Sequence, residues 1–370
     1  MGYVRFLLAL IVLIGHTPLG SYIPTVGSVG AVEGFFLISG FYMAATYTRN
    51  YAADGRVAHF LASRAIRLYP LYFAILLANV VFFHLATANG WHSNFYQTFN
   101  YFLETGVWRP HLPVWSLLFQ DLVSVHAKVH LELPVRQAWS ISAEIVFYAM
   151  TPLLCRFRSS LLALTAIMFA VKAALYFTLG WRYAYFPFFG QLCYFTLGMW
   201  LYFHRETLTW GRRPAIVMLL AATVILMSTG QASFEFGTLL HQAIFIGTLV
   251  IVTPTLFRHI NGRLSNRLGD LSYGVYLSHF LVFEVLLTSG LFSQTAPSTW
   301  DLVGWPVATI LITCATTWLF ERAIQDRLDA WRRRRFYAHR LLDAGAHEVA
   351  AATAASPRPI DPVPEGRYGA

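Results

Sequence analysis

Apolar stretches recur along most of this chain, with short polar segments between them. Ten can be recognised, at roughly 3–20, 26–48, 68–89, 139–155, 159–179, 183–203, 214–230, 239–257, 270–290 and 302–320. A helix of roughly 20 apolar residues crosses the hydrocarbon core of a bilayer. The pattern therefore predicts an all-α integral membrane protein with about ten transmembrane helices.

The basic residues between these stretches are divided unevenly between the two sides of the predicted bundle. With a cytoplasmic N-terminus, one set of loops contains most of the arginines, including the run 332–335, whereas the opposite loops contain only Arg109, Lys128, Arg136 and Arg182. Cytoplasmic loops are enriched in Lys and Arg, so we expect both termini in the cytoplasm. The net charge of +9 then reflects topology, and nucleic-acid binding is not expected.

Composition agrees with a membrane protein. Hydrophobic residues make up 56% of the 370 positions and charged residues only 12%, about half the charged fraction of soluble domains. Cys155, Cys193 and Cys314 all lie in apolar stretches, without the spacing of a metal site or a disulfide framework. We interpret them as packing residues.

The first apolar stretch is not followed by the small-residue cleavage site of a signal peptide. We therefore expect it to be retained as a membrane span.

One loop is much longer than the others, at about 90–138, on the extracytoplasmic side. It is rich in aromatic residues, and its alternating segment 125–132 suggests a short strand. Loops of this length usually act as lids or binding elements. His126 and His130 could form a metal pair, but we favour a solvated cap and expect no metal.

The remaining chain divides simply. We expect a transmembrane domain at 1–325, a basic cytoplasmic segment at 326–343 and a disordered tail at 344–370, which is rich in Ala and Pro. The basic segment suits contact with anionic membrane lipids.

The first stretch carries two ionisable residues, Arg5 and His16. Eleven positions along a helix return to within about 20° of the starting direction and advance roughly 16 Å, so both face the same way. Ionisable groups inside a span are costly and usually functional. We expect Arg5 near one membrane surface and His16 near mid-bilayer.

Arg64 and Arg67 precede the third stretch, and Pro70 follows them. Proline suits the first turn of a helix, and a helix N-terminus with two guanidinium groups suits phosphate. Arginines at this place also simply obey the positive-inside rule.

Carboxylates enter two further stretches. Glu33 begins the segment that continues through Ser39 to Gly40, where small residues allow close helix approach. Glu144 follows Trp139 by five positions, about one turn inside the fourth stretch. A carboxylate at that depth needs a partner or a water-filled cavity.

Tyr276 and His279 lie three positions apart in the ninth stretch, on one helical face. Three more polar residues fall inside stretches, at Lys172, His241 and Glu284. We interpret these three as structural hydrogen-bond partners.

In this order, the motifs resemble the acyltransferase-3 family of multi-pass membrane O-acyltransferases over roughly residues 3–320. The matching segments are Arg5 with His16, Glu33 to Gly40, Arg67 to Pro70, Trp139 with Ser140 and Glu144, and Ser272 to His279. We recognise no fused esterase-like domain, which many family members carry.

The resemblance implies transfer of an acyl group, most often acetyl, from cytoplasmic acyl-CoA to a hydroxyl of an extracytoplasmic or lipid-linked saccharide. It implies the bacterial cytoplasmic (inner) membrane, acetyl-CoA as donor and no metal. The implied catalytic residues are His16, Arg5, Glu144 and Glu33; those for the donor are Arg64 and Arg67; those for substrate are Ser39, Trp139, Tyr276 and His279.

Two chemical routes stay open. Histidine, with an ordinary pKa near 6.5, is the natural general base, so His16 could deprotonate the acceptor hydroxyl for direct attack. Alternatively an acyl-enzyme forms on His16 or Ser39. We favour the direct route or an acyl-histidine, because Ser39 has no base nearby in sequence.

A different class of function is a proton-coupled secondary transporter, with the intramembrane ionisable groups as a relay. We find no convincing match between the two halves of the chain, which inverted repeats would produce. A scaffold or receptor function would not explain why His16 lies inside a membrane span.

Overall fold

The computed structural model describes residues 1–23, 26–53, 55–91, 135–228, 239–259, 262–293, 298–332 and 334–335. These residues form α-helices and short 3₁₀ and π segments, with no strand among them. The α-helices are α1 (Gly2–Gly15), α2 (Gly27–Asn50), α3 (Val57–Ala88), α6 (Ala138–Arg156), α7 (Leu161–Leu179), α8 (Trp181–Tyr185), α9 (Phe188–Phe203), α10 (Arg205–Leu208), α11 (Arg212–Ser228), α12 (Leu239–His259), α13 (Arg263–Thr288) and α14 (Thr299–Phe320). The short segments are η1 (Pro18–Ser21), η4 (Arg158–Ser160) and the π-helical η5 (Glu321–Gln325).

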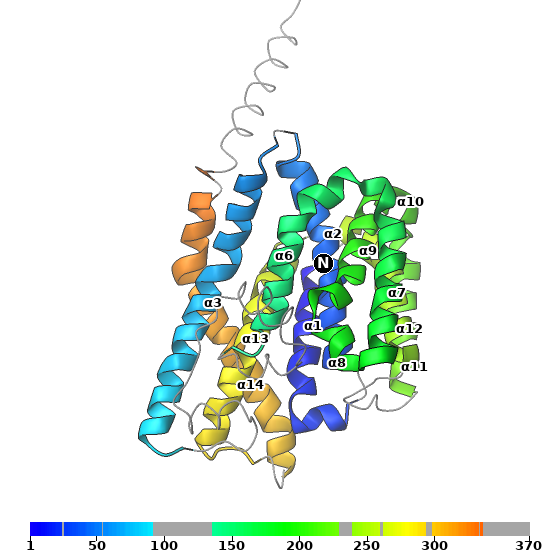
Figure 1. The fold of residues 1–370 in the computed structure, drawn as a ribbon. Coiled ribbons are helices and arrows are strands. Elements are labelled where there is room, and N and C mark those ends of the chain that lie inside the picture. The colour runs from blue at the N-terminus through cyan, green and yellow to red at the C-terminus, as the bar shows by residue number, and fades with distance from the viewer. Residues whose placement is uncertain are drawn as a thin grey trace, which may run out of the picture.

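The long helices run side by side along one bundle (Figure 1). Among the described residues, seven helices are long and apolar enough to cross a membrane, whereas α1, α9 and α11 have 14, 16 and 17 residues. The expectation of an all-α membrane protein is confirmed. The count of ten spans and the cytoplasmic termini stay predictions.

The third expected span differs from the structure at its start. Helix α3 begins at Val57, well before residue 68, and Pro70 lies inside it. Arg64 and Arg67 are therefore inside the helix, where backbone N–H groups are already bonded. The interpretation of this site as a helix N-terminus for phosphate is wrong.

Several sequence predictions fall on residues outside the described ranges. They are the strand at 125–132, the histidines of the long loop and the tail at 344–370. The side chain of His241 is outside them too. The division into domains is likewise untested and stays a prediction.

Helices α2 and α9 pack closely against each other. A Cβ added at Gly40 would collide with the carbonyl oxygen of Phe195, and one added at Gly198 would collide with the carbonyl oxygen of Leu37. Reciprocal approach of this kind requires glycine on both helices, as expected for the segment around Gly40. Beside it, Phe147 of α6 stacks on Phe195 with ring centroids 4.4 Å apart, so α6 is held against the same pair.

We expect Gly198→Ala to destabilise the bundle, because the obstructing atom belongs to backbone and cannot rotate away. Overpacking of this kind costs about 1–3 kcal/mol or more. The matched control is Gly247→Ala in α12, where an added Cβ meets nothing within 4 Å. Thermal unfolding in detergent should show a lower midpoint for the first variant only. Equal midpoints would mean that α2 and α9 separate without cost.

Candidate active site

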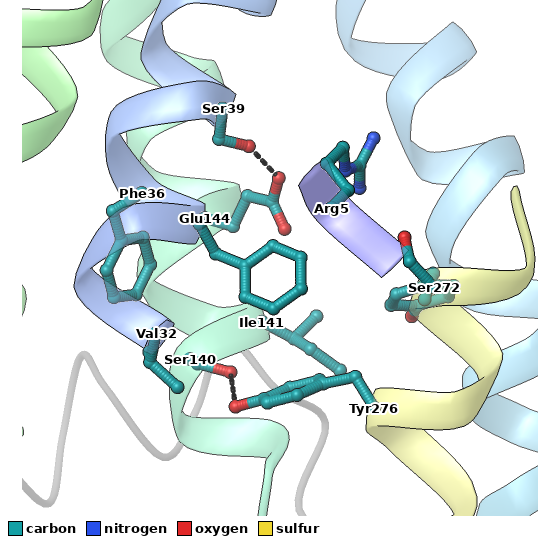
Figure 2. Close-up of a pocket in the computed structure, with 11 residues that line it drawn as sticks. Arg5, Val32, Phe36, Ser39, Ser140, Ile141, Glu144, Ser272 and Tyr276 are labelled. Carbon is teal, nitrogen blue, oxygen red and sulfur yellow. Dashed lines mark hydrogen bonds between the residues drawn. The ribbon is translucent and has the colours of Figure 1, made fainter. Parts of the chain in front are cut away.

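A cavity of about 50 Å³ lies between α1, α2, α6 and α13 (Figure 2). Its lining residues are Arg5, Val32, Phe35, Phe36, Ser39, Ser140, Ile141, Glu144, Ser272, Tyr273 and Tyr276. This volume accommodates a few water molecules or a thin chain. Predicted site residues from four separate motifs thus meet around one space.

Glu144 is held in this cavity by two hydroxyl groups. The Ser39 hydroxyl and the Tyr148 hydroxyl, the latter at 2.5 Å, both donate to Oε1. The described residues provide no hydrogen bond to the other carboxylate oxygen, Oε2. The expectation that this carboxylate needs a partner or a cavity is confirmed, since it has both. Tyr148 lies one turn after Glu144, which is the signal that could have identified it in the sequence.

Arg5 lies across the cavity from Glu144 (Figure 2). Within the described part of the chain, its guanidinium makes no ion pair or hydrogen bond. Helix α1 begins part-way along the bundle (Figure 1), and Met1 is buried at 1% exposure. We expected Arg5 near a membrane surface; the structure instead places it beside this interior cavity.

His16 caps the C-terminal end of α1 and does not line the cavity. Its Nδ1 lies 2.6 Å from the carbonyl oxygen of Val12. A carbonyl only accepts, so Nδ1 carries the proton and Nε2 presents a lone pair. The ring packs beside His279 and Phe280 of α13, with centroids 5.4 and 4.7 Å away.

His279 is the second imidazole of this pair and is fully buried. Its Nδ1 lies 2.6 Å from the carbonyl oxygen of Tyr276, so the proton again sits on Nδ1. Its Nε2 has no hydrogen-bond partner among the described residues. The Gln137 amide nitrogen lies 3.4 Å from Nδ1, a neighbour that the sequence analysis did not single out.

Tyr276 links the cavity to the histidine pair. Its hydroxyl lies 2.8 Å from that of Ser140, and its position one turn before His279 is the one expected. Arg5 lines the cavity together with Ser272, Tyr273 and Tyr276 of α13, and His16 packs beside His279 of the same helix. The expectation that the two share one face of the first helix agrees with these contacts.

A family model described as an acyltransferase domain, that of the acyltransferase-3 family, matches residues 1–322 of the 370. The chain belongs to this family. No curated protein and no solved structure is significantly similar to it. The fold and the family together make it a membrane acyltransferase, as the order of the motifs predicted.

Glu33 and Trp139 of this acyltransferase also lie outside the cavity. Glu33, exposed by 1%, forms a 2.9 Å ion pair with Lys172 of α7, whose amino group also donates to the carbonyl oxygen of Ala184 at 2.9 Å. Trp139 packs on Tyr185 with ring centroids 4.9 Å apart. The resemblance implied a catalytic role for Glu33, but its carboxylate is directed to Lys172 of α7. Lys172 is the structural partner that we expected.

The two residues expected to bind the acyl donor, Arg64 and Arg67, have different surroundings. Arg67 contacts three carboxylates, those of Asp270 at 2.5 Å and of Glu321 and Asp329 at 3.6 Å. The guanidinium of Arg64 instead lies over the ring of Phe60, 5.9 Å from its centroid. Its buried Nε has no hydrogen-bond partner among the described residues. Of the two, Arg64 is the one whose guanidinium makes no ion pair with the described residues.

We expect Lys172→Met to destabilise this acyltransferase by about 3–5 kcal/mol, because the buried carboxylate of Glu33 would lose its counter-charge. The double variant Glu33→Gln/Lys172→Met should recover most of this loss, as measured by thermal unfolding in detergent. Turnover per folded molecule should then return. A stable double variant without turnover would restore Glu33 to the reaction.

Proposed function

We propose that this acyltransferase moves an acyl group, acetyl in the simplest case, from cytoplasmic acyl-CoA to a hydroxyl of an extracytoplasmic or lipid-linked saccharide. We propose the bacterial cytoplasmic membrane as its location. The observation that carries the proposal is the orientation of His16, whose Nδ1 is bonded to Val12 so that Nε2 acts as the base. Membership of an acyltransferase family favours this activity over that of a proton-coupled transporter.

In the direct route, His16 Nε2 takes the proton of the acceptor hydroxyl while the hydroxyl oxygen attacks the thioester carbon. The tetrahedral intermediate then breaks its carbon–sulfur bond, and the departing thiolate takes the proton from the imidazolium. The products are an ester and coenzyme A. A base positioned in this way contributes roughly 10²–10⁴-fold.

The structure gives the acyl-serine route a base that the sequence did not reveal. The Ser39 hydroxyl donates to Glu144, which is 105 positions away in the chain. We still propose His16, because its Nδ1 is bonded to the carbonyl oxygen of Val12 and its Nε2 therefore carries the lone pair, whereas the Glu144 oxygen that faces Ser39 already accepts a second hydrogen bond from Tyr148.

We expect His16→Ala to lower acyl transfer by at least about 10²-fold without unfolding the protein. The matched control is His204→Ala, because His204 also caps a helix, with its Nδ1 3.0 Å from the carbonyl oxygen of Trp200. Transfer from labelled acetyl-CoA to membrane glycans of the host provides the assay. Near-normal turnover of the His16 variant would rule it out as base, and a comparable loss in Ser39→Ala would favour an acyl-serine.

We expect Arg64→Ala to weaken binding of coenzyme A by about 10- to 150-fold, since a charge-assisted contact to phosphate is lost. Arg49→Ala is the control, because Arg49 also lies over an aromatic ring, 5.2 Å from that of Phe257. Arg67→Ala should mainly lower the unfolding temperature, because three carboxylates lose their cation. Unchanged affinity for coenzyme A in the Arg64 variant would mean that this arginine does not bind the donor and only follows the positive-inside rule.

A further inference from the structure

Two buried polar side chains beside His16 each have an acceptor atom without a hydrogen-bond partner among the described residues. They are His279 of α13, with 0% of its surface exposed, and Gln137 at the start of α6, with 3% exposed. The atoms concerned are Nε2 of His279 and Oε1 of Gln137. Most buried polar atoms in proteins are hydrogen-bonded, so two neighbouring acceptors of this kind point to a ligand that supplies donors.

The imidazoles of His16 and His279 are oriented in the same way. In His16, Nδ1 donates to the carbonyl oxygen of Val12 at 2.6 Å. In His279, it donates to the carbonyl oxygen of Tyr276 at the same distance. Each Nε2 therefore carries the lone pair, and the ring centroids are 5.4 Å apart. Helices α1 and α13 thus hold two acceptor nitrogens near enough for hydroxyl groups on adjacent carbon atoms of one molecule.

The amide of Gln137 adds a donor and a third acceptor to this pair. Its nitrogen lies 3.4 Å from Nδ1 of His279. That Nδ1 already carries a proton and cannot accept one, so the amide N–H groups are left for another partner. A primary amide both donates and accepts, as a hydroxyl group does. The chemistry of the three side chains therefore suits a molecule with several hydroxyl groups.

An aromatic ring covers the two histidines. Phe280 is half-buried, and its ring centroid lies 4.7 Å from that of His16 and 4.5 Å from that of His279. The guanidinium of Arg136 lies over the same ring, 5.4 Å from its centroid. Sites for small polar ligands combine aromatic walls with a few placed polar groups, as here. Because Phe280 contacts both imidazoles, its ring must turn aside to admit a saccharide.

We propose that His279 and Gln137 bind the hydroxyl next to the one that is acylated, so that this enzyme acts on a vicinal diol of a sugar ring. The inference rests on the proposed function. The reacting hydroxyl donates to Nε2 of His16, while its neighbour donates to Nε2 of His279 and contacts the amide of Gln137. The primary hydroxyl of a hexopyranose is then excluded as an acceptor, because the adjoining ring carbon has no hydroxyl. His279 and Gln137 determine specificity, and neither takes a proton from the substrate.

The position of the new ester tests this inference without any variant. The wild-type full chain in lipid nanodiscs transfers labelled acetyl groups from acetyl-CoA to membrane glycans of the host, and two-dimensional NMR locates the ester. The acetylated carbon should adjoin a carbon with a free hydroxyl. An ester on a primary hydroxyl, or between two carbons without free hydroxyls, would overturn the inference and leave the proposed function intact. Absence of transfer to any glycan would instead overturn the proposed function.

Variants test the two residues separately. His279→Phe and Gln137→Leu should each raise the KM for the glycan by about 10- to 100-fold, because a hydrogen bond to a buried polar group is lost. The KM for acetyl-CoA should be unchanged. His279→Gln, which retains an acceptor oxygen, should recover part of the loss. A merely structural role would not produce this separation between the two substrates.

Gln191→Leu is the matched control. Gln191 is also fully buried with an Oε1 that has no described partner, but its amide nitrogen donates to the carbonyl oxygen of Tyr185. The KM for the glycan should be normal in this variant. Should His279→Phe fail to fold, Gln137→Leu still tests the second hydroxyl. An unchanged KM for the glycan in a folded variant would overturn the inference, as would an equal rise in the KM for acetyl-CoA.

Discussion

The need to neutralise charge inside an apolar bundle is the constraint on which the rest of this structure depends. Glu33 with Lys172 joins α2 to α7, and Arg67 with its three carboxylates joins α3 to α13 and to the helix after α14. An ionised group left alone in such a place is costly, so these pairs fix which helices are neighbours.

The cavity differs from these pairs in that its charges are only partly neutralised. Glu144 receives two hydroxyl hydrogen bonds on one oxygen, and Arg5 opposite makes no ion pair among the described residues. Charges that are paired elsewhere hold the bundle together, while those at the cavity are available to a ligand. The same contrast separates Arg67, surrounded by carboxylates, from Arg64, which has an unsatisfied Nε.

Sequence reasoning succeeded where one helix contains the whole signal. The spacing of Tyr276 and His279 and the need of Glu144 for a partner are properties of single helices, and the structure has them. Sequence reasoning failed where a motif residue has its partner on another helix. Glu33 matches the family pattern as well as Ser39 does, yet it faces Lys172. No local pattern shows which polar residue of a mostly apolar helix faces the cavity. The prediction that Pro70 lies in the first turn of a helix was wrong, because a helix with a membrane-embedded proline continues when neighbouring helices support it.

The sequence by itself determined the class of protein, the approximate helices and the family, because hydrophobicity, charge and short motifs are properties of neighbouring residues. The tertiary structure alone decided which groups meet. Ser39 and Glu144 are 105 positions apart, and Arg67 and Asp270 are 203 apart. Their contact depends on how whole helices pack, in particular on the glycines that bring α2 against α9 and so set the position of Ser39 beside α6.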